Sequence, residues 1–255
     1  MKKVILPKEK IHVGMLQLVN ALHPLECENE EEFVPANPNY PHILINCKVA
    51  NALQLVLKTI SSGNEIIPVS GYRSFEEQTK IYDDSLKENG EIFTKKFVAL
   101  PGRSEHQTGL AIDLALNKEE IDFICPDFPY EGICEVFRQT AYDYGFIERY
   151  PKGKENITGI SHEPWHFRYV GYPHSRIIQQ KGVTFEEYID LIKSFNNDHK
   201  MNFTEDRDRV FSIYYVPACG DKTEIQIPED CFYEFSGNNI DGFIVTVWRK
   251  KDDEK

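Results

Sequence analysis

Hydrophobic residues recur at helical spacing in four segments of the chain. These segments are residues 47–63, 74–90, 130–146 and 184–195. Ser74 and Glu77 stand in the spacing of a capping box, which predicts that the second helix begins there. Gly63 and Gly90 follow the last periodic positions of the first two segments, where helices commonly end. We therefore expect four helices.

Short runs rich in β-branched and aromatic residues predict strands. Three of them lie between the helices, at residues 64–72, 110–116 and 162–171. After about residue 203 the chain changes character, and short β-rich segments follow one another, separated by Gly, Pro and Asn. Residues 1–46 show neither helical nor strand periodicity, so we expect them to be irregular. They include an acidic run at 26–33, which we expect to be solvated.

This order of elements predicts an α+β body that carries a small antiparallel appendage. We expect the body to span residues 1–200 and the β-rich C-terminal extension to span 201–255. The pattern assigns no role to the extension, and it leaves the oligomeric state open.

Composition and charge narrow the class of partner. The hydrophobic content of 41% is that of an ordinary globular protein, and the net charge of −12 argues against nucleic acid and against an anionic membrane surface. The first residues lack the apolar stretch of a signal peptide, and no later run is long enough to cross a bilayer. The six cysteines are scattered without a Cys-x-x-Cys pair. We expect a cytoplasmic protein with free thiols.

One carboxylate stands out inside an apolar strand. In "LAIDLAL" the leucines and the isoleucine share one face, while Asp113 shares the other with two alanines. A buried carboxylate is costly unless it is paired, and small neighbours leave space in front of it. We therefore expect Asp113 to face a pocket.

Three residues together offer the ligands of a metal site. His106 precedes a glycine turn before Asp113, and His166 lies on the polar side of the strand 162–171. Two imidazoles and one carboxylate suit a zinc ion with an open fourth position. Zinc lowers the pKa of a water ligand to about 7, and Glu163 stands near enough in sequence to take the proton.

Each of these residues also has a structural interpretation when it is taken alone. His106 would then be a loop histidine, and Asp113 would cap a neighbouring turn. For His162, the sequence favours a role as metal ligand no more than a supporting or surface position. Only the joint pattern, S-x-H-x-x-G-x-A-x-D followed by E-P-W-H, is specific.

Three motifs in this order carry a family resemblance: "SGYRS" (70–74), "SEHQTGLAID" (104–113) and "GISHEPWHFRYVG" (159–171). They closely resemble the zinc D-Ala-D-Ala peptidases of vancomycin resistance, the VanX, VanY and VanXY groups, which are distantly similar to the hedgehog signalling domain. The resemblance covers a motif-bearing core at about 45–195. It implies a central antiparallel sheet with flanking helices.

The resemblance also implies roles for single residues. His106, Asp113 and His166 would hold Zn²⁺, and Glu163 would be the general base. Arg73 of "GYRS" would stabilise the oxyanion that forms when water attacks the scissile carbonyl. Two further residues, Ser104 and Gln78, are candidates for binding the terminal carboxylate of the substrate.

The motifs look more like those of VanY, whereas the absence of an anchor is typical of the VanXY group. We therefore expect an enzyme that hydrolyses the D-Ala-D-Ala dipeptide and trims C-terminal D-Ala from cytoplasmic muramyl-pentapeptide precursors, which contributes to vancomycin resistance. One alternative is a peptidoglycan peptidase of other specificity, such as an L-Ala–D-Glu endopeptidase. The other is a zinc-binding module without catalysis, although such a module would need neither Glu163 nor Arg73.

Overall fold

The computed structural model describes residues 1–27, 32–205 and 209–250. The chain divides into two units, one formed by Val19–Thr184 and the other by Met1–Leu18 together with Phe185–Lys255. Part of the acidic run at 26–33 lies outside the described residues. The six cysteines are free. Within the described part of the chain, no helix combines the length and apolar character that a bilayer crossing needs.

The division differs from the boundary expected at residue 200. β1 (Lys2–Pro7) pairs antiparallel with β10 (Lys222–Ile227), so the first residues join the C-terminal strands. Helix α6 (Phe185–Ile192) belongs to the same unit and lies against β9. The expectation that residues 1–46 are irregular is wrong, because they also form β2 (Phe33–Pro35) and β3 (Leu44–Asn46).

A four-stranded sheet forms the centre of the larger unit. Its order is β4 (Ile66–Ser70), β5 (Ala111–Leu116), β7 (Glu163–Tyr169) and β6 (Phe146–Tyr150), and all neighbours are antiparallel. The expected central antiparallel sheet is thereby confirmed.

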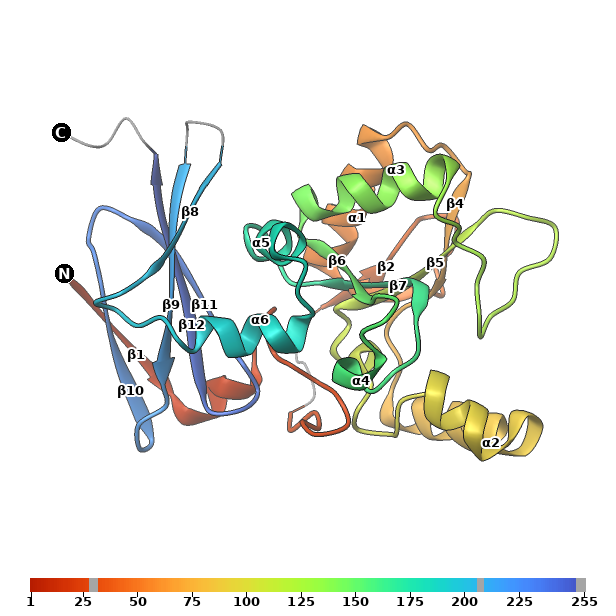
Figure 1. The fold of residues 1–255 in the computed structure, drawn as a ribbon, viewed down its shortest axis with the longest axis horizontal. Coiled ribbons are helices and arrows are strands. Elements are labelled where there is room, and N and C mark those ends of the chain that lie inside the picture. The colour runs from red at the N-terminus through yellow and green to blue at the C-terminus, as the bar shows by residue number, and fades with distance from the viewer. Residues whose placement is uncertain (28–31, 206–208, 251–255) are drawn as a thin grey trace. The chain divides into compact units, whose positions relative to one another are not determined.

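Two helices cover one face of this sheet. They are α1 (Cys47–Thr59) and α3 (Gly132–Ala141), which lie side by side (Figure 1). Their apolar sides pack against Ile112 of β5 and Phe167 of β7 in a fully buried core. Since the helices take the apolar face, Asp113 of β5 and His166 of β7 stand on the opposite face.

Two of the expected helical segments differ in extent from those in the structure, and two further helices appear. α2 (Phe75–Phe97) starts with the predicted capping box, but Gly90, with φ of 78°, makes a kink and the helix continues beyond it. The segment 130–146 is not one helix: α3 is followed by a 3₁₀ turn, Tyr142–Tyr144, and Phe146 already begins β6. α4 (Glu155–Thr158) and α5 (His174–Lys181) were not expected.

The smaller unit is rich in β-structure, as predicted. β8 (Met201–Glu205), β9 (Arg209–Pro217), β11 (Phe232–Gly237) and β12 (Gly242–Lys250) form an antiparallel sheet in the order β11-β12-β9-β8. Buried residues of this sheet and of β1 and β10 share one core, which includes Leu6, Tyr214, Ile225 and Phe243.

Candidate active site

The strand register places the polar residues of the central sheet in one row. Ser70 on β4 is the cross-strand partner of Asp113 on β5, and Asp113 is the partner of His166 on β7. Oδ1 of Asp113 lies 2.9 Å from Nδ1 of His166. Two members of the predicted metal triad are therefore brought together by backbone pairing alone.

The third member comes from the 3₁₀ turn Glu105–Thr108 that precedes β5. Gly109 ends this turn with φ of +68°, and a Cβ there would lie 2.3 Å from the ring of Phe33, so the position requires glycine. The turn brings Nε2 of His106 to 3.2 Å from Oδ2 of Asp113. Nδ1 of His106 donates to the carbonyl of Gly71 at 2.7 Å, which leaves the lone pair on Nε2.

The three side chains fit a zinc ion. They are all buried, and one potential ligand atom from each lies within 4.8 Å of the others. Ligand atoms at about 2.0–2.2 Å from a tetrahedral zinc ion are roughly 3.3 Å apart. The separations of 3.2 and 2.9 Å between the imidazole nitrogens and the carboxylate of Asp113 are close to that value.

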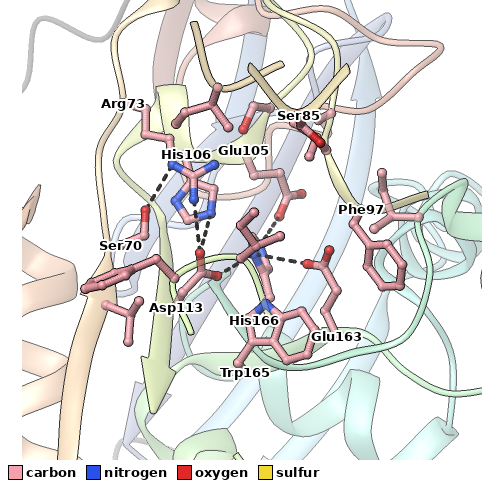
Figure 2. Close-up of a pocket in the computed structure, with 18 of the residues that line it drawn as sticks. Ser70, Arg73, Ser85, Phe97, Glu105, His106, Asp113, Glu163, Trp165 and His166 are labelled. Atoms are coloured by element: carbon pink, nitrogen blue, oxygen red, sulfur yellow. Dashed lines mark hydrogen bonds and ion pairs between the residues drawn. The ribbon is translucent and has the colours of Figure 1, made fainter. Parts of the chain in front are cut away.

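A cavity of about 420 Å³ opens over this cluster. Figure 2 shows His106, Asp113 and His166 converging in it, with Arg73 on one side and Glu163 on the other. Ser104 also lines the cavity. Apolar side chains complete the wall, among them Ile81, Phe97, Val98 and Trp165. The cavity thus combines a few polar groups with an apolar lining, as small-molecule sites do.

Arg73 is held by three partners. Its Nε donates to Oγ of Ser70 at 2.9 Å, its Nη1 to Oε1 of Gln78 at 3.3 Å, and its Nη2 to Oδ2 of Asp113 at 3.2 Å. Gln78 is fully buried, and its Nε2 donates to the carbonyl of Ala99 at 2.8 Å. Both ends of the Gln78 amide are therefore engaged within the fold, and Gln78 is not among the residues that line the cavity, so its contact with the substrate carboxylate stays a prediction.

Glu163, the first residue of β7, lies beside the triad. Its Oε2 is 3.7 Å from Nδ1 of His166, and burial raises the pKa of Glu163 to about 8. A carboxylate with a raised pKa is a stronger base than an exposed one. A cation bound at the triad would favour the charged form by its own field.

The two triad histidines have opposite electrostatic surroundings. Burial, with help from the Arg73 guanidinium, lowers the pKa of His106 to about 4. Burial also opposes charge on His166, but the carboxylate of Asp113, supported by Glu105 and Glu163, raises its pKa to about 9. His106 is therefore neutral and ready to act as a ligand, whereas a metal must displace a proton from His166.

One functional candidate was missed by the sequence analysis. Glu105 is fully buried, and its Oε1 contacts Nε of Arg149 at 2.8 Å and Nη1 of Arg168 at 3.1 Å. Burial opposes its charge, but the two guanidiniums hold the pKa of Glu105 well below its usual range. The only signal in the sequence is its place between Ser104 and His106, since Arg149 and Arg168 are distant along the chain.

His162 lies apart from the triad. Its Nε2 is 2.7 Å from the hydroxyl of Tyr130, and that hydroxyl donates its hydrogen to Glu148. Arg138 donates to the other oxygen of Glu148 at 2.7 Å. Of the alternatives that the sequence left open, the structure therefore favours a supporting position for His162.

Comparison with known proteins places the chain in a family. The sequence model VanY, described as D-alanyl-D-alanine carboxypeptidase, matches residues 42–172, which include every residue of the candidate site. The chain belongs to the VanY family. The expected resemblance is confirmed, and members of this type are D,D-dipeptidases and D,D-carboxypeptidases, so the chain is an enzyme of the peptidase class.

Individual relatives support the same placement. VanXYC of Enterococcus gallinarum, a bifunctional D-Ala-D-Ala dipeptidase and carboxypeptidase, is 46% identical over 182 residues, which are 71% of this chain and 96% of that protein. The crystal structure of the D,D-dipeptidase VanXYg with a D-Ala-D-Ala phosphinate analogue matches at a TM-score of 0.96 and 61% identity, covering 97% of this chain and 99% of that one.

A third relative was solved with a metal. A vancomycin-resistance D,D-pentapeptidase VanY in complex with Zn(II) matches at a TM-score of 0.58 and 31% identity, covering 69% of this chain and 98% of that one. Zinc therefore occurs in the family, and the residues of this chain fit it.

Proposed function

We propose that this chain is a zinc-dependent peptidase that hydrolyses D-Ala-D-Ala and removes the C-terminal D-Ala from muramyl-pentapeptide precursors. The observation that carries the proposal is the convergence of His106, Asp113 and His166 beside Glu163 in one cavity. The relatives named above, which act on or bind D-Ala-D-Ala, support the choice of substrate.

The three ligands would hold Zn²⁺, which when bound supplies Lewis-acid polarisation of the scissile carbonyl and acidifies water. Glu163 takes the proton of the attacking water on its carboxylate and passes it to the nitrogen of the departing D-Ala. Its position suits it to both steps, because Glu163 lines the cavity beside the triad, with Oε2 3.7 Å from Nδ1 of His166.

Arg73 stabilises the negative charge that develops on the carbonyl oxygen during attack. Its guanidinium lines the cavity and is fixed by Ser70 and Gln78, so little reorganisation is needed when the charge appears. Gln78 thus acts on Arg73 rather than on the substrate. Ser104, which faces the cavity, is the better candidate to contact the terminal carboxylate.

We place this activity in the cytoplasm, where the pentapeptide precursors are made and where their trimming removes the vancomycin target. The net charge of −12 speaks against nucleic acid or an anionic membrane as a partner. The enzyme then contributes to vancomycin resistance by destroying D-Ala-D-Ala ends before they reach the cell surface.

The experiment that tests this function measures D-Ala release from the dipeptide and from the muramyl-pentapeptide side by side, with an L-Ala–D-Glu peptide as the competing substrate. We expect free D-Ala from both D-Ala-D-Ala substrates, loss of release after chelation, and recovery on addition of Zn²⁺. Zinc-loaded protein that releases no D-Ala, or that cleaves only the L-Ala–D-Glu bond, would overturn the proposal.

A further inference from the structure

Glu105 and His166 face each other through two buried polar atoms. Oε2 of Glu105 lies 3.7 Å from Nε2 of His166, which is longer than a hydrogen bond (Figure 2). Among the described residues neither atom has a hydrogen-bond partner. A carboxylate oxygen accepts and a ring N–H donates, so a shift of less than one ångström would pair two groups that burial otherwise penalises.

The carboxylate of Glu105 is fixed in this direction. Its Oε1 is held by Arg149 of β6 and Arg168 of β7, and all three side chains are fully buried. The second oxygen is therefore left to face the His166 ring. The guanidiniums are donors only, so the Glu105 carboxylate meets both of them as an acceptor.

The opposite nitrogen of the same ring points to the candidate metal site. Nδ1 of His166 is 2.9 Å from Asp113 and 3.7 Å from Glu163. A ring that gives its Nδ1 lone pair to a metal must carry its proton on Nε2, the nitrogen that faces Glu105. Carboxylates commonly hold metal-binding histidines in this way.

We propose that Glu105 is a positioning residue that accepts the Nε2–H of His166 and thereby presents Nδ1 to zinc. The inference rests on the zinc site of the proposed function. Glu105 links the buried arginine pair to the metal site, and its bond to the ring closes when zinc takes Nδ1.

Two variants distinguish the positioning role from a merely structural one, in which Glu105 only neutralises the two arginines. Glu105→Asp keeps the charge beside the arginines but is one methylene too short to reach the ring. Glu105→Gln keeps the length, and when its amide oxygen stays on the arginines its NH₂ group meets the Nε2–H, donor against donor. Glu148→Gln is the matched control, because it makes the same change in a buried carboxylate that pairs with Arg138 away from the triad.

The readout is the zinc dissociation constant of each folded variant, measured by competition with a chromophoric chelator. We expect zinc to bind about 10–100-fold more weakly to both Glu105 variants, and as tightly as to the wild type in Glu148→Gln. Glu105→Asp with wild-type zinc affinity would overturn this inference alone. A wild-type protein that binds no zinc would overturn the proposed function as well.

A second measurement needs no variant. Long-range ¹H–¹⁵N spectra of the zinc-loaded wild type report which ring nitrogen carries the proton. We expect Nε2–H and metal-bound Nδ1 for His166, and the reverse for His106, whose Nδ1 donates to Gly71. Zinc on Nε2 of His166 would overturn the inference even if no Glu105 variant folds.

Discussion

Asp113 and His166 are direct cross-strand partners on β5 and β7, with 2.9 Å between Oδ1 and Nδ1. Their side chains share the sheet face opposite the core under α1 and α3. A register slip of one residue would turn both toward that core, so the apolar pattern that fixes the register also fixes the spacing of two metal ligands. Folding and metal binding are linked through this pair.

Asp113→Ala should leave the protein nearly free of zinc, because it removes the only carboxylate of the triad and the partner of both histidines. The zinc content of purified protein measures this directly. Ser70→Ala is the control from the same cross-strand row, and it should keep its zinc. Asp113→Ala with a full complement of zinc would show that the ion binds elsewhere.

Gln78 should act through Arg73, because its amide oxygen accepts a hydrogen bond from Nη1 of Arg73 at 3.3 Å. Removal of a donor that stabilises an oxyanion costs about 10²–10³-fold in kcat, so we expect a loss of that size for Arg73→Ala and a smaller one for Gln78→Met. The double variant should then be no slower than Arg73→Ala. If the two losses multiply, Gln78 contributes independently and contacts the substrate.

Gly109→Ala should destabilise the fold through two effects. The backbone has φ of +68°, and the new Cβ would clash with the ring of Phe33. Gly63→Ala is the matched control, since its φ is +53° and no atom lies within 4 Å of the added Cβ. We expect Gly109→Ala to lower the free energy of unfolding by about 1–3 kcal/mol more than Gly63→Ala. Equal losses would mean that Phe33 moves aside freely.

His174 should make the protein sensitive to mild acid. Burial lowers the pKa of His174 to about 3, so the unfolded chain takes up a proton between pH 6.5 and 3 that the folded chain refuses. Its contribution to stability is present above pH 6.5 and falls as the pH drops, by about 2 kcal/mol between pH 6.5 and 5. No such change arises above pH 6.5.

Urea unfolding at pH 7 and pH 5 checks this effect. His174→Phe should lose less of its free energy of unfolding over this interval than the wild type does. His42→Phe, at an exposed position, is the control. It should lose as much free energy of unfolding between pH 7 and pH 5 as the wild type does. If His174→Phe shows the full wild-type loss, other groups carry the acid sensitivity.

The sequence predicts the parts of this site that depend on local periodicity. Alternation along β5 and β7 places Asp113 and His166 on the polar faces of their strands, and the capping box marks the start of α2 at Ser74. The motif spacing adds His106 and Glu163. These features are readable because each depends on residues that are close in sequence.

Features that depend on distant pairing were not predicted. β1 pairs with β10 more than 200 residues away, and nothing in Lys2–Pro7 alone shows a strand partner. The apolar period of α3 continues past Ala141, so the predicted helix ran on to Phe146, although Gly145 with φ of 93° ends the helical course, and β6 was not predicted. Glu105 was missed because only the folded chain brings Arg149 and Arg168 to it.

The most direct test of the whole account is to measure zinc content and D-Ala release from D-Ala-D-Ala on the same samples of the wild type and Glu163→Ala. We predict one zinc per chain in both, D-Ala release by the wild type, and a rate about 10²–10⁴-fold lower in the variant, because only the general base is lost. A zinc-loaded Glu163→Ala protein that turns over at the wild-type rate would contradict the account.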